Sequence, residues 1–180
     1  MNTGAVIAVC ADQQHNMMKP ERQQITLVAG YGVQGDAHFG KTIQHLYDKR
    51  RNPDAPNLRQ VHLIHAELID TLARDGLEVD PGQMGENITT RGINLLDLPR
   101  GTRLHIGGAV IEITGLRNPC GKLNTIQKGL LPAVLAKDDT GAARPKTGVM
   151  AIVVKGGDIR PGAGIKAVLP DGPPIPLTPV

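Results

Sequence analysis

Apolar residues along the chain fall in short runs that are separated by glycine, proline and polar residues. Residues 4–9 and 24–29 are apolar and contain β-branched side chains, which predicts two strands. Residues 58–64 have enough of the same character to predict a third strand. A long irregular stretch separates the second strand from the third. The pattern therefore favours many short strands over long helices.

A β-hairpin is the most clearly predicted element. Residues 102–106 and 109–114 flank Gly107 and Gly108, and two glycines permit the positive φ angles of a tight two-residue loop. Apolar and polar side chains alternate along the second segment, as they do in a half-buried strand. The sequence thus predicts two antiparallel strands joined at these glycines.

Helical character is limited to two segments. In residues 65–74 the apolar side chains recur one and four positions apart, and Gly76 follows as a C-terminal stop, so one short helix is expected. Residues 123–137 are expected to be partly helical despite Pro132. Two or three short helices are predicted in all.

The last third of the chain predicts two more strands and an extended tail. Residues 147–155 and 164–169 are expected to be strands, with a turn at residues 156–158 between them. The segment 170–180 contains five prolines in 11 residues and is expected to be extended and peripheral. We therefore predict one domain over residues 1–169, followed by this Pro-rich tail.

The composition agrees with one folded, mainly β domain. The 180 residues include 22 glycines and 14 prolines, a density of turn formers that favours short strands built into a partly closed barrel, with a few short helices. Aromatic residues make up 2% of the chain, too few for a protein that stacks successive bases of a single strand. The net charge of +3 is too small to indicate nucleic-acid binding.

No segment predicts membrane insertion or secretion. The longest apolar run near the start, residues 4–11, is far shorter than the ~20 residues of a membrane-spanning helix, and no Lys or Arg precedes it. We therefore expect a cytoplasmic protein without a membrane partner. In that reducing compartment Cys10 and Cys120 are expected to be free thiols.

Two glycine-rich matches to nucleotide-binding motifs are interpreted as fortuitous. Residues 35–42 fit the P-loop pattern G-x4-G-K-[ST], but no strand leads directly into them and no later strand ends in a metal-binding aspartate. Residues 30–35 fit G-x-G-x-x-G, but Gly35 and Gly40 would interrupt the helix that this motif requires. A P-loop nucleotide-binding protein remains the least favoured alternative.

Cys120 is the most informative residue of the sequence. It lies in a predicted loop between the hairpin and a helix, and Pro119 and Gly121 flank it. Residues 113–137 contain four Lys or Arg and no acid. Cations close to a thiol favour its thiolate form, which attacks electrophiles, carries persulfide sulfur and ligates soft metals. Cys10, in an apolar strand, is interpreted as a buried structural residue.

The sequence resembles the MOSC domain family, named for the C-terminal domain of molybdenum cofactor sulfurase, and in particular its small stand-alone bacterial members. The segments that carry the resemblance are 32–38 (GVQGDAH), 59–61 (RQV), 85–89 (GENIT), 104–112 (LHIGGAVIE) and 117–124 (RNPCGKLN). The resemblance covers most of the chain. It implies a largely β fold around a distorted barrel, and an association with sulfur transfer and with molybdenum cofactor.

The resemblance also implies a set of site residues. Cys120 matches the motif cysteine that can ligate molybdenum and is the predicted catalytic residue. The predicted cofactor-binding residues are Arg117, Asn118, Lys122, Asn87, Arg59, His38 and Asp36. A structural role is equally open for two of them, a loop hydrogen bond for His38 and a backbone cap for Asn87, and a surface salt bridge is the alternative for Arg59.

Other polar clusters are interpreted as structural. His62 and His65 have the spacing H-x-x-H, but on a strand these positions face opposite sides, so no dedicated zinc site is expected. Residues 49–51 (KRR) are interpreted as a solvated loop rather than a nucleic-acid patch.

The resulting functional hypothesis is a protein that carries sulfur as a persulfide, binds molybdenum cofactor, or does both through Cys120. For small bacterial members the resemblance implies sulfur carriage or the reduction of N-hydroxylated compounds. The sequence leaves open whether the protein is an enzyme, either a molybdenum-dependent oxidoreductase or a sulfurtransferase-type carrier, or a non-catalytic cofactor-binding module. The expected partners are a cysteine desulfurase or other sulfur donor, or a separate reductase, together with a small-molecule substrate.

Overall fold

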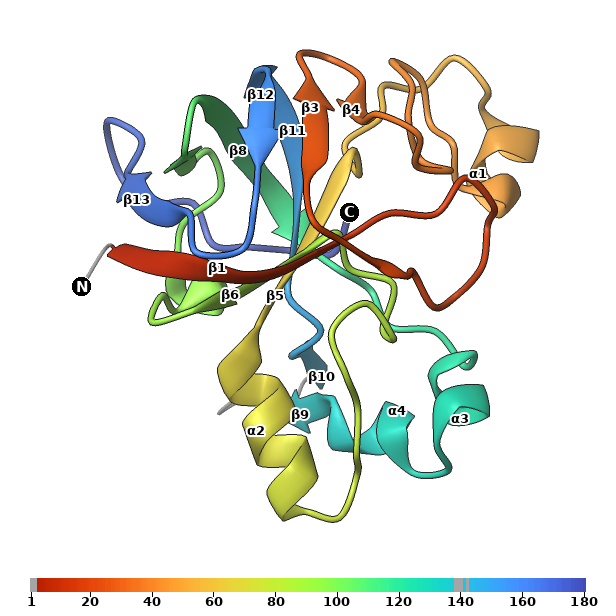
Figure 1. Ribbon diagram of the computed structural model, residues 1–180. Coiled ribbons are helices and arrows are strands. Elements are labelled where there is room, and N and C mark those ends of the chain that lie inside the picture. The colour runs from red at the N-terminus through yellow and green to blue at the C-terminus, as the bar shows by residue number, and fades with distance from the viewer. Residues whose placement is uncertain (1–2, 138–140, 142) are drawn as a thin grey trace.

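Seven strands close into a barrel in the computed structural model, which describes residues 3–137, 141 and 143–180 (Figure 1). Around the barrel the strands are β1 (Thr3–Cys10), β6 (Ile88–Arg91), β5 (Val61–His65), β11 (Val149–Lys155), β8 (Ala109–Leu116), β7 (Arg103–Ile106) and β13 (Gly164–Val168). Pairing of β13 with β1 joins the two edges. The predicted mainly β fold is confirmed, and the barrel is closed rather than partly closed.

A single parallel pair interrupts the antiparallel order of the described barrel strands. Strands β5 and β6 run parallel, and helix α2 (Ala66–Arg74) lies between them in the chain. The helix buries Leu68 and Leu72 and ends before Gly76, whose φ of +80° is favourable for glycine. This helix was predicted over residues 65–74.

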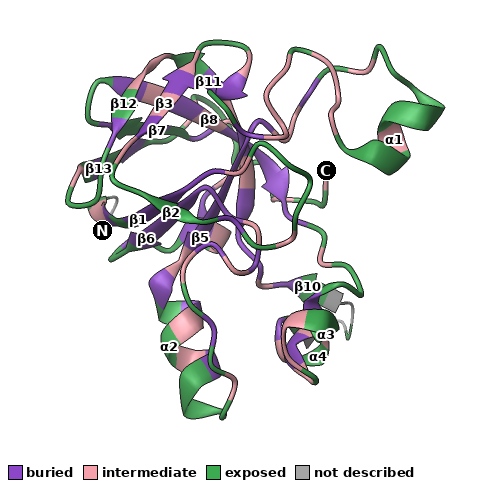
Figure 2. Ribbon diagram, turned by 45° about the vertical axis from the view of Figure 1, so that its right-hand side comes forward, coloured by how far each residue is buried: buried purple, intermediate pink, exposed green. Residues whose placement is uncertain are grey.

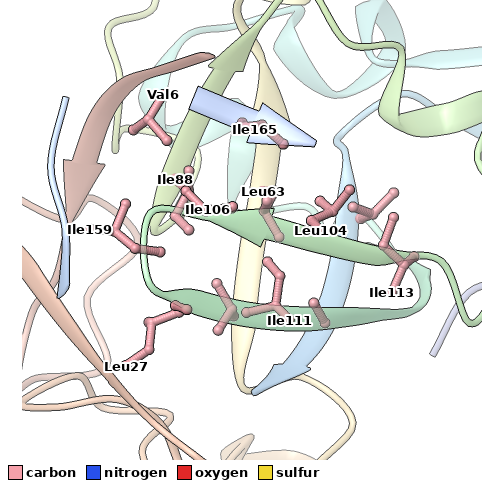
Figure 3. Close-up of a cluster of buried hydrophobic side chains, with 14 of the residues drawn as sticks. Val6, Leu27, Leu63, Ile88, Leu104, Ile106, Ile111, Ile113, Ile159 and Ile165 are labelled. Carbon is pink, nitrogen blue, oxygen red and sulfur yellow. The ribbon is translucent and has the colours of Figure 1, made fainter. Parts of the chain in front are cut away.

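Two apolar clusters stabilise the structure. The larger fills the barrel with inward-facing side chains from every barrel strand, including Val6, Leu63 and Ile111 (Figure 3). The smaller lies outside the barrel, where Leu72 of α2 packs with buried residues such as Met84 and Leu123. In Figure 2 the end of α2 next to the barrel is coloured as buried and intermediate, and its far end is coloured as exposed.

Short strands and helices make up the rest of the described structure. A three-stranded sheet contains β3 (Ile25–Val28), β4 (Gly32–Val33) and β12 (Gly157–Ile159), and a two-stranded sheet contains β9 (Leu135–Lys137) and β10 (Ala143–Pro145). The remaining elements are β2 (Glu21–Arg22), α1 (Leu46–Arg51), the 3-10 turn Leu95–Asp97, α3 (Leu123–Ile126) and α4 (Leu130–Ala133). The described residues thus contain four short α-helices where two or three were expected.

Most predicted elements are confirmed within a few residues, with two corrections. Residues 156–158 were expected to be a simple turn, but Gly157–Ile159 is strand β12 and pairs with β3. Gly156 allows this pairing, because a Cβ there would lie 2.7 Å from the Leu27 carbonyl oxygen. The strand predicted at 58–64 begins only at Val61.

The Pro-rich tail contacts the barrel at its end. Most of residues 170–180 are exposed, and the end of the tail is hydrogen-bonded to the end of β8. The Leu116 amide donates to the Thr178 carbonyl oxygen at 2.8 Å, and the Val180 amide donates to the Leu116 carbonyl oxygen at 3.2 Å. These bonds extend the end of β8, the strand that leads to Cys120.

No helix within the described residues has the length and apolarity needed to cross a membrane.

Candidate functional site

A cavity of about 440 Å³ opens between the loop that follows β1, helix α1 and the loop that follows β8. Its lining contains four permanent cations and four histidines: Lys19, Arg59, Arg117, Lys122, His15, His38, His45 and His62. None of the described lining residues is an Asp or Glu. Lys19 and Arg59 are paired with Asp36 and Asp48, so the excess positive charge that favours an anionic ligand comes from Arg117 and Lys122.

Cys120 lies on the wall of this cavity and is exposed. The loop of residues 117–122 connects β8 to α3, as predicted, and the Leu123 amide closes it by donating to the Cys120 carbonyl oxygen at 3.1 Å. Arg117, Asn118 and Lys122 of the same loop also line the cavity. The structure therefore brings the thiol and the three predicted cofactor-binding residues of its segment to one opening.

Arg117 is a buried cation whose charge lacks a full set of partners. Its backbone is fixed, since its amide donates to the Gly148 carbonyl oxygen at 3.0 Å and its carbonyl oxygen accepts from the Thr147 hydroxyl at 3.0 Å. The residue is 8% exposed, and among the described residues Nη1 has no hydrogen-bond partner. Burial lowers the pKa of Arg117, and the nearby Cys120 acts in the opposite direction. A negative group in the cavity would compensate this charge.

Asp36 lies behind the cavity and organises two of its lining residues. Its carboxylate is 2.8 Å from the Lys19 ammonium, and it accepts from the His38 amide at 3.0 Å. The His38 ring nitrogen Nδ1 lies 3.3 Å from the same carboxylate. Burial by itself would raise the pKa of Asp36, but the His38 hydrogen bonds and the Lys19 charge outweigh it and hold that pKa well below its usual range. Asp36 therefore acts on the site through Lys19 and His38.

Asn87 borders the cavity, but its side-chain amide is bonded within the protein. Its Oδ1 accepts from the His62 amide at 3.1 Å, and its Nδ2 donates to the Cys10 carbonyl oxygen at 3.1 Å and to Asp36 at 3.0 Å. The side chain links strands β1 and β5 to the loop that contains Asp36. The sequence left cofactor binding and backbone capping open for Asn87, and these hydrogen bonds correspond to backbone capping.

His38 and Arg59 both line the cavity, and each also makes a structural contact. The His38 ring packs edge-on against the His15 ring with 5.3 Å between centroids. Arg59 donates to the Asp48 carboxylate at 3.0 Å, and both side chains are partly exposed. Seven of the eight predicted site residues therefore line one cavity, and the eighth, Asp36, supports it from behind.

Several lining residues were missed by the sequence analysis. His15 and Lys19 come from residues 11–20, which have neither periodicity nor a motif and so gave no signal. His62 was considered only as a zinc ligand. Its ring nitrogen Nε2 donates to the Thr147 carbonyl oxygen at 2.7 Å, while burial and then the Arg117 charge lower its pKa to about 3. His65 is not part of the lining, as expected for the opposite face of the strand.

The segment that matches a P-loop does not have P-loop geometry. Strand β4 ends at Val33, the chain then forms turns, and the next helix begins only at Leu46. The Lys41 ammonium lies 5.2 Å from the centre of the Tyr31 ring. Residues 35–42 thus lack the helix N-terminus that would face a phosphate.

The sequence analysis interpreted two other polar clusters as structural, residues 49–51 and the pair His62 and His65. Residues 49–51 are exposed, but they form the last turn of α1 rather than a loop. Within the described ranges no group of three or more His, Cys, Asp or Glu could hold a metal ion.

Comparisons with known proteins agree with this architecture. The model of the MOSC domain family matches residues 34–166. The YuaD protein from Bacillus subtilis has 20% sequence identity and a TM-score of 0.72 over 92% of this chain and 95% of that chain. YiiM from Escherichia coli has 21% identity and a TM-score of 0.61 over 95% and 73% of the two chains. YiiM from Geobacillus stearothermophilus has 19% identity and a TM-score of 0.59 over 91% and 73%. At these identities the similarity concerns the fold, and no curated protein matches the chain.

Proposed function

Because the chain belongs to the MOSC domain family, we propose that its cavity binds molybdenum cofactor and that Cys120 is the reactive group, as a molybdenum ligand or as a persulfide carrier. The observation that carries the proposal is the exposed Cys120 thiol beside the buried, incompletely partnered Arg117 guanidinium in one cation-lined cavity.

The residues present fit such a cofactor, which is a pterin with a dithiolene group and a phosphate. Arg117 Nη1 lacks a partner within the described residues, and Lys122 is exposed on the same loop, so a phosphate would meet two uncompensated donors. By contrast, Lys19 and Arg59 already pair with Asp36 and Asp48. The cavity volume of about 440 Å³ lies in the range of cofactor-binding pockets.

Each side chain then has a definite task. Arg117 and Lys122 would hold the phosphate and stabilise the Cys120 thiolate. Asn118, His38 and Arg59 would contact the pterin, while Asp36 keeps His38 and Lys19 in place. The bound group would supply two-electron redox chemistry at its metal. The chain's own contribution is the thiolate, the positive charge and the walls that limit access of water.

Persulfide carriage uses the same thiolate. The Cys120 sulfur attacks the outer sulfur of a persulfide on a cysteine desulfurase, a new S–S bond forms, and the donor's S–S bond breaks. The donor leaves as a thiolate, so Cys120 gains one sulfur atom and no net oxidant is needed. This role requires a reducing compartment, in which the thiol is kept reduced.

Turnover separates the remaining alternatives. As a reductase of N-hydroxylated compounds, the protein would need electrons from a separate reductase. As a cofactor-binding module it would bind without turnover. The cavity chemistry is the same in both cases, so binding is tested first.

The test is to produce the protein in a host that makes the cofactor and to measure bound molybdenum by mass spectrometry and bound pterin by fluorescence after oxidation. Sulfur loading from a persulfidated cysteine desulfurase is measured on the cofactor-free protein. We expect Cys120→Ser and Arg117→Gln to lose most of the loading, whereas Cys10→Ala, a change at the other thiol, keeps it. A wild-type protein that retains neither pterin nor sulfur would contradict the proposal.

A further inference from the structure

Exposed apolar side chains gather at the rim of the cavity. Helix α1 has no buried residue, although its first two side chains, Leu46 and Tyr47, line the opening. These two are 53% and 61% exposed, and Met18, which follows the lining residue Met17, is 54% exposed. Figure 1 shows α1 standing away from the barrel. Two large apolar residues that face solvent therefore line the opening, and the exposed Met18 is adjacent in sequence to a third lining residue.

The same rim is strongly basic, although the whole chain has a net charge of only +3. Arg59, Arg117 and Lys122 line the opening, and helix α1 adds Lys49, Arg50 and Arg51 and a single acid, Asp48. The one acid, Asp48, is occupied by Arg59 and His45, each at 3.0 Å. The exposed last turn of α1 is therefore purely basic, with Lys49, Arg50 and Arg51.

Arg51 connects the basic and the apolar parts of this rim. Its Nη1 donates to the Tyr47 hydroxyl at 3.0 Å, and its guanidinium lies 5.5 Å from the centre of the Tyr47 ring. Tyr and Arg are the residues most enriched among the energetic centres of protein interfaces. Protein interfaces commonly have apolar residues at the centre and charged residues around them. Because the charged residues around this apolar group are positive, an acidic partner surface is favoured.

We propose that the rim formed by Met18, α1 and the Lys122 loop is the docking surface for an acidic patch on the protein that delivers sulfur to Cys120. Cys120 is exposed at the same opening, so a donor docked there would bring its persulfide to the thiol. The inference rests on the proposed function for the identity of the donor as a sulfur carrier. The preference for an acidic surface follows from the rim itself.

The test uses short peptides of glutamate, glutamine or lysine, each ending in a cysteine activated as a mixed disulfide with thiopyridine. The rate of Cys120 modification is followed by release of thiopyridone and assigned by peptide mass spectrometry. We expect the glutamate peptide to react on the order of tenfold faster than the glutamine peptide at low salt, with the difference lost at high salt. The triple variant Lys49→Gln, Arg50→Gln, Arg51→Gln should lower the glutamate rate toward the glutamine rate.

A matched control separates docking from net charge. The triple variant Lys155→Gln, Arg160→Gln, Lys166→Gln removes the same charge from exposed positions of β11, β13 and the segment between them, and it should leave the peptide preference intact. Three results would overturn the inference. The three peptides could react with the wild-type protein at equal rates, or both triple variants could lower the rate of the glutamate peptide equally. The third is a fluorescent oligonucleotide that binds in an α1-dependent way in place of the glutamate peptide. Sulfur loading of Cys120 by free cysteine persulfide is measured in parallel. If this loading fails, the proposed function is contradicted. The peptide rates then decide separately whether the rim is a docking surface for an acidic partner.

Discussion

The Asp36 carboxylate lies 2.8 Å from the Lys19 ammonium, and the two side chains are 0% and 3% exposed. This buried ion pair joins the loop after β1 to the loop that holds His38, and both loops contribute to the cavity wall. The pair is therefore the internal support of the positively charged site.

Asp36→Asn should destabilise the protein by about 3–5 kcal/mol, because it leaves a buried ammonium without its counter-charge. The control is Asp70→Asn, which removes the exposed ion pair with Arg91 and should cost less than about 1 kcal/mol. Denaturant unfolding measures both. Similar costs for the two variants would contradict the structural role given to the buried pair.

The pH dependence of stability should reveal His62. Burial lowers its pKa to about 3, so the folded state excludes a proton that the unfolded chain binds below pH ~6.5. Stability contributed by the neutral ring is present above that pH and is lost progressively as the pH falls toward the folded value. The loss by pH 5 should be on the order of 2 kcal/mol.

The measurement compares wild type with His62→Gln by urea unfolding at pH 7 and pH 5. The variant is expected to show the smaller decrease, whatever its absolute stability. Ring resonances of His62 that shift with a midpoint near pH 6.5 in the folded protein would show instead that the ring is accessible to protons.

Local patterns predicted most of the elements and the loop that contains Cys120. Gly107 and Gly108 define the hairpin in the sequence, and segment 117–124 identifies Cys120 and its neighbours by motif and charge. The contact of Lys19 with Asp36 could not be predicted, since it depends on how two irregular loops meet in space. β12 was missed for the same reason, because its pairing with β3 is non-local. The features that could not be predicted are therefore those that long-range contacts build, including part of the cavity wall.

Replacing Gly148 tests how closely the start of β11 packs against β5. The φ of Gly148 is +82°, and an added Cβ would clash with the Leu63 carbonyl oxygen of β5. The Gly148 carbonyl oxygen also accepts from the Arg117 amide at 3.0 Å, so a shift here reaches the Cys120 loop. Gly148→Ala should cost about 3 kcal/mol or more, because backbone strain and a steric clash add.

Gly164→Ala is the control for this change, since an added Cβ there meets nothing within 4 Å and its φ is not in the left-handed region. It should alter the free energy of unfolding by less than about 1 kcal/mol. A Gly148→Ala protein as stable as this control would show that β5 and β11 can separate more easily than the structure indicates.

The two thiols should differ sharply in reactivity. Burial, followed by the charge of Glu86, raises the pKa of Cys10 to about 12, and the side chain is inaccessible. Cys120 is exposed on the same loop as Arg117, and the proposed function assigns to that guanidinium the stabilisation of the thiolate. Iodoacetamide at neutral pH should therefore modify Cys120 more than about a hundredfold faster than Cys10, as measured by mass spectrometry of the digested protein. When the protein is unfolded in guanidinium chloride, the two rates should converge. In the folded protein, Arg117→Gln should slow the modification of Cys120, whereas Lys166→Gln should not. If the Arg117 variant reacts at the wild-type rate, the guanidinium does not stabilise the thiolate, and the chemical role assigned to this pair is wrong.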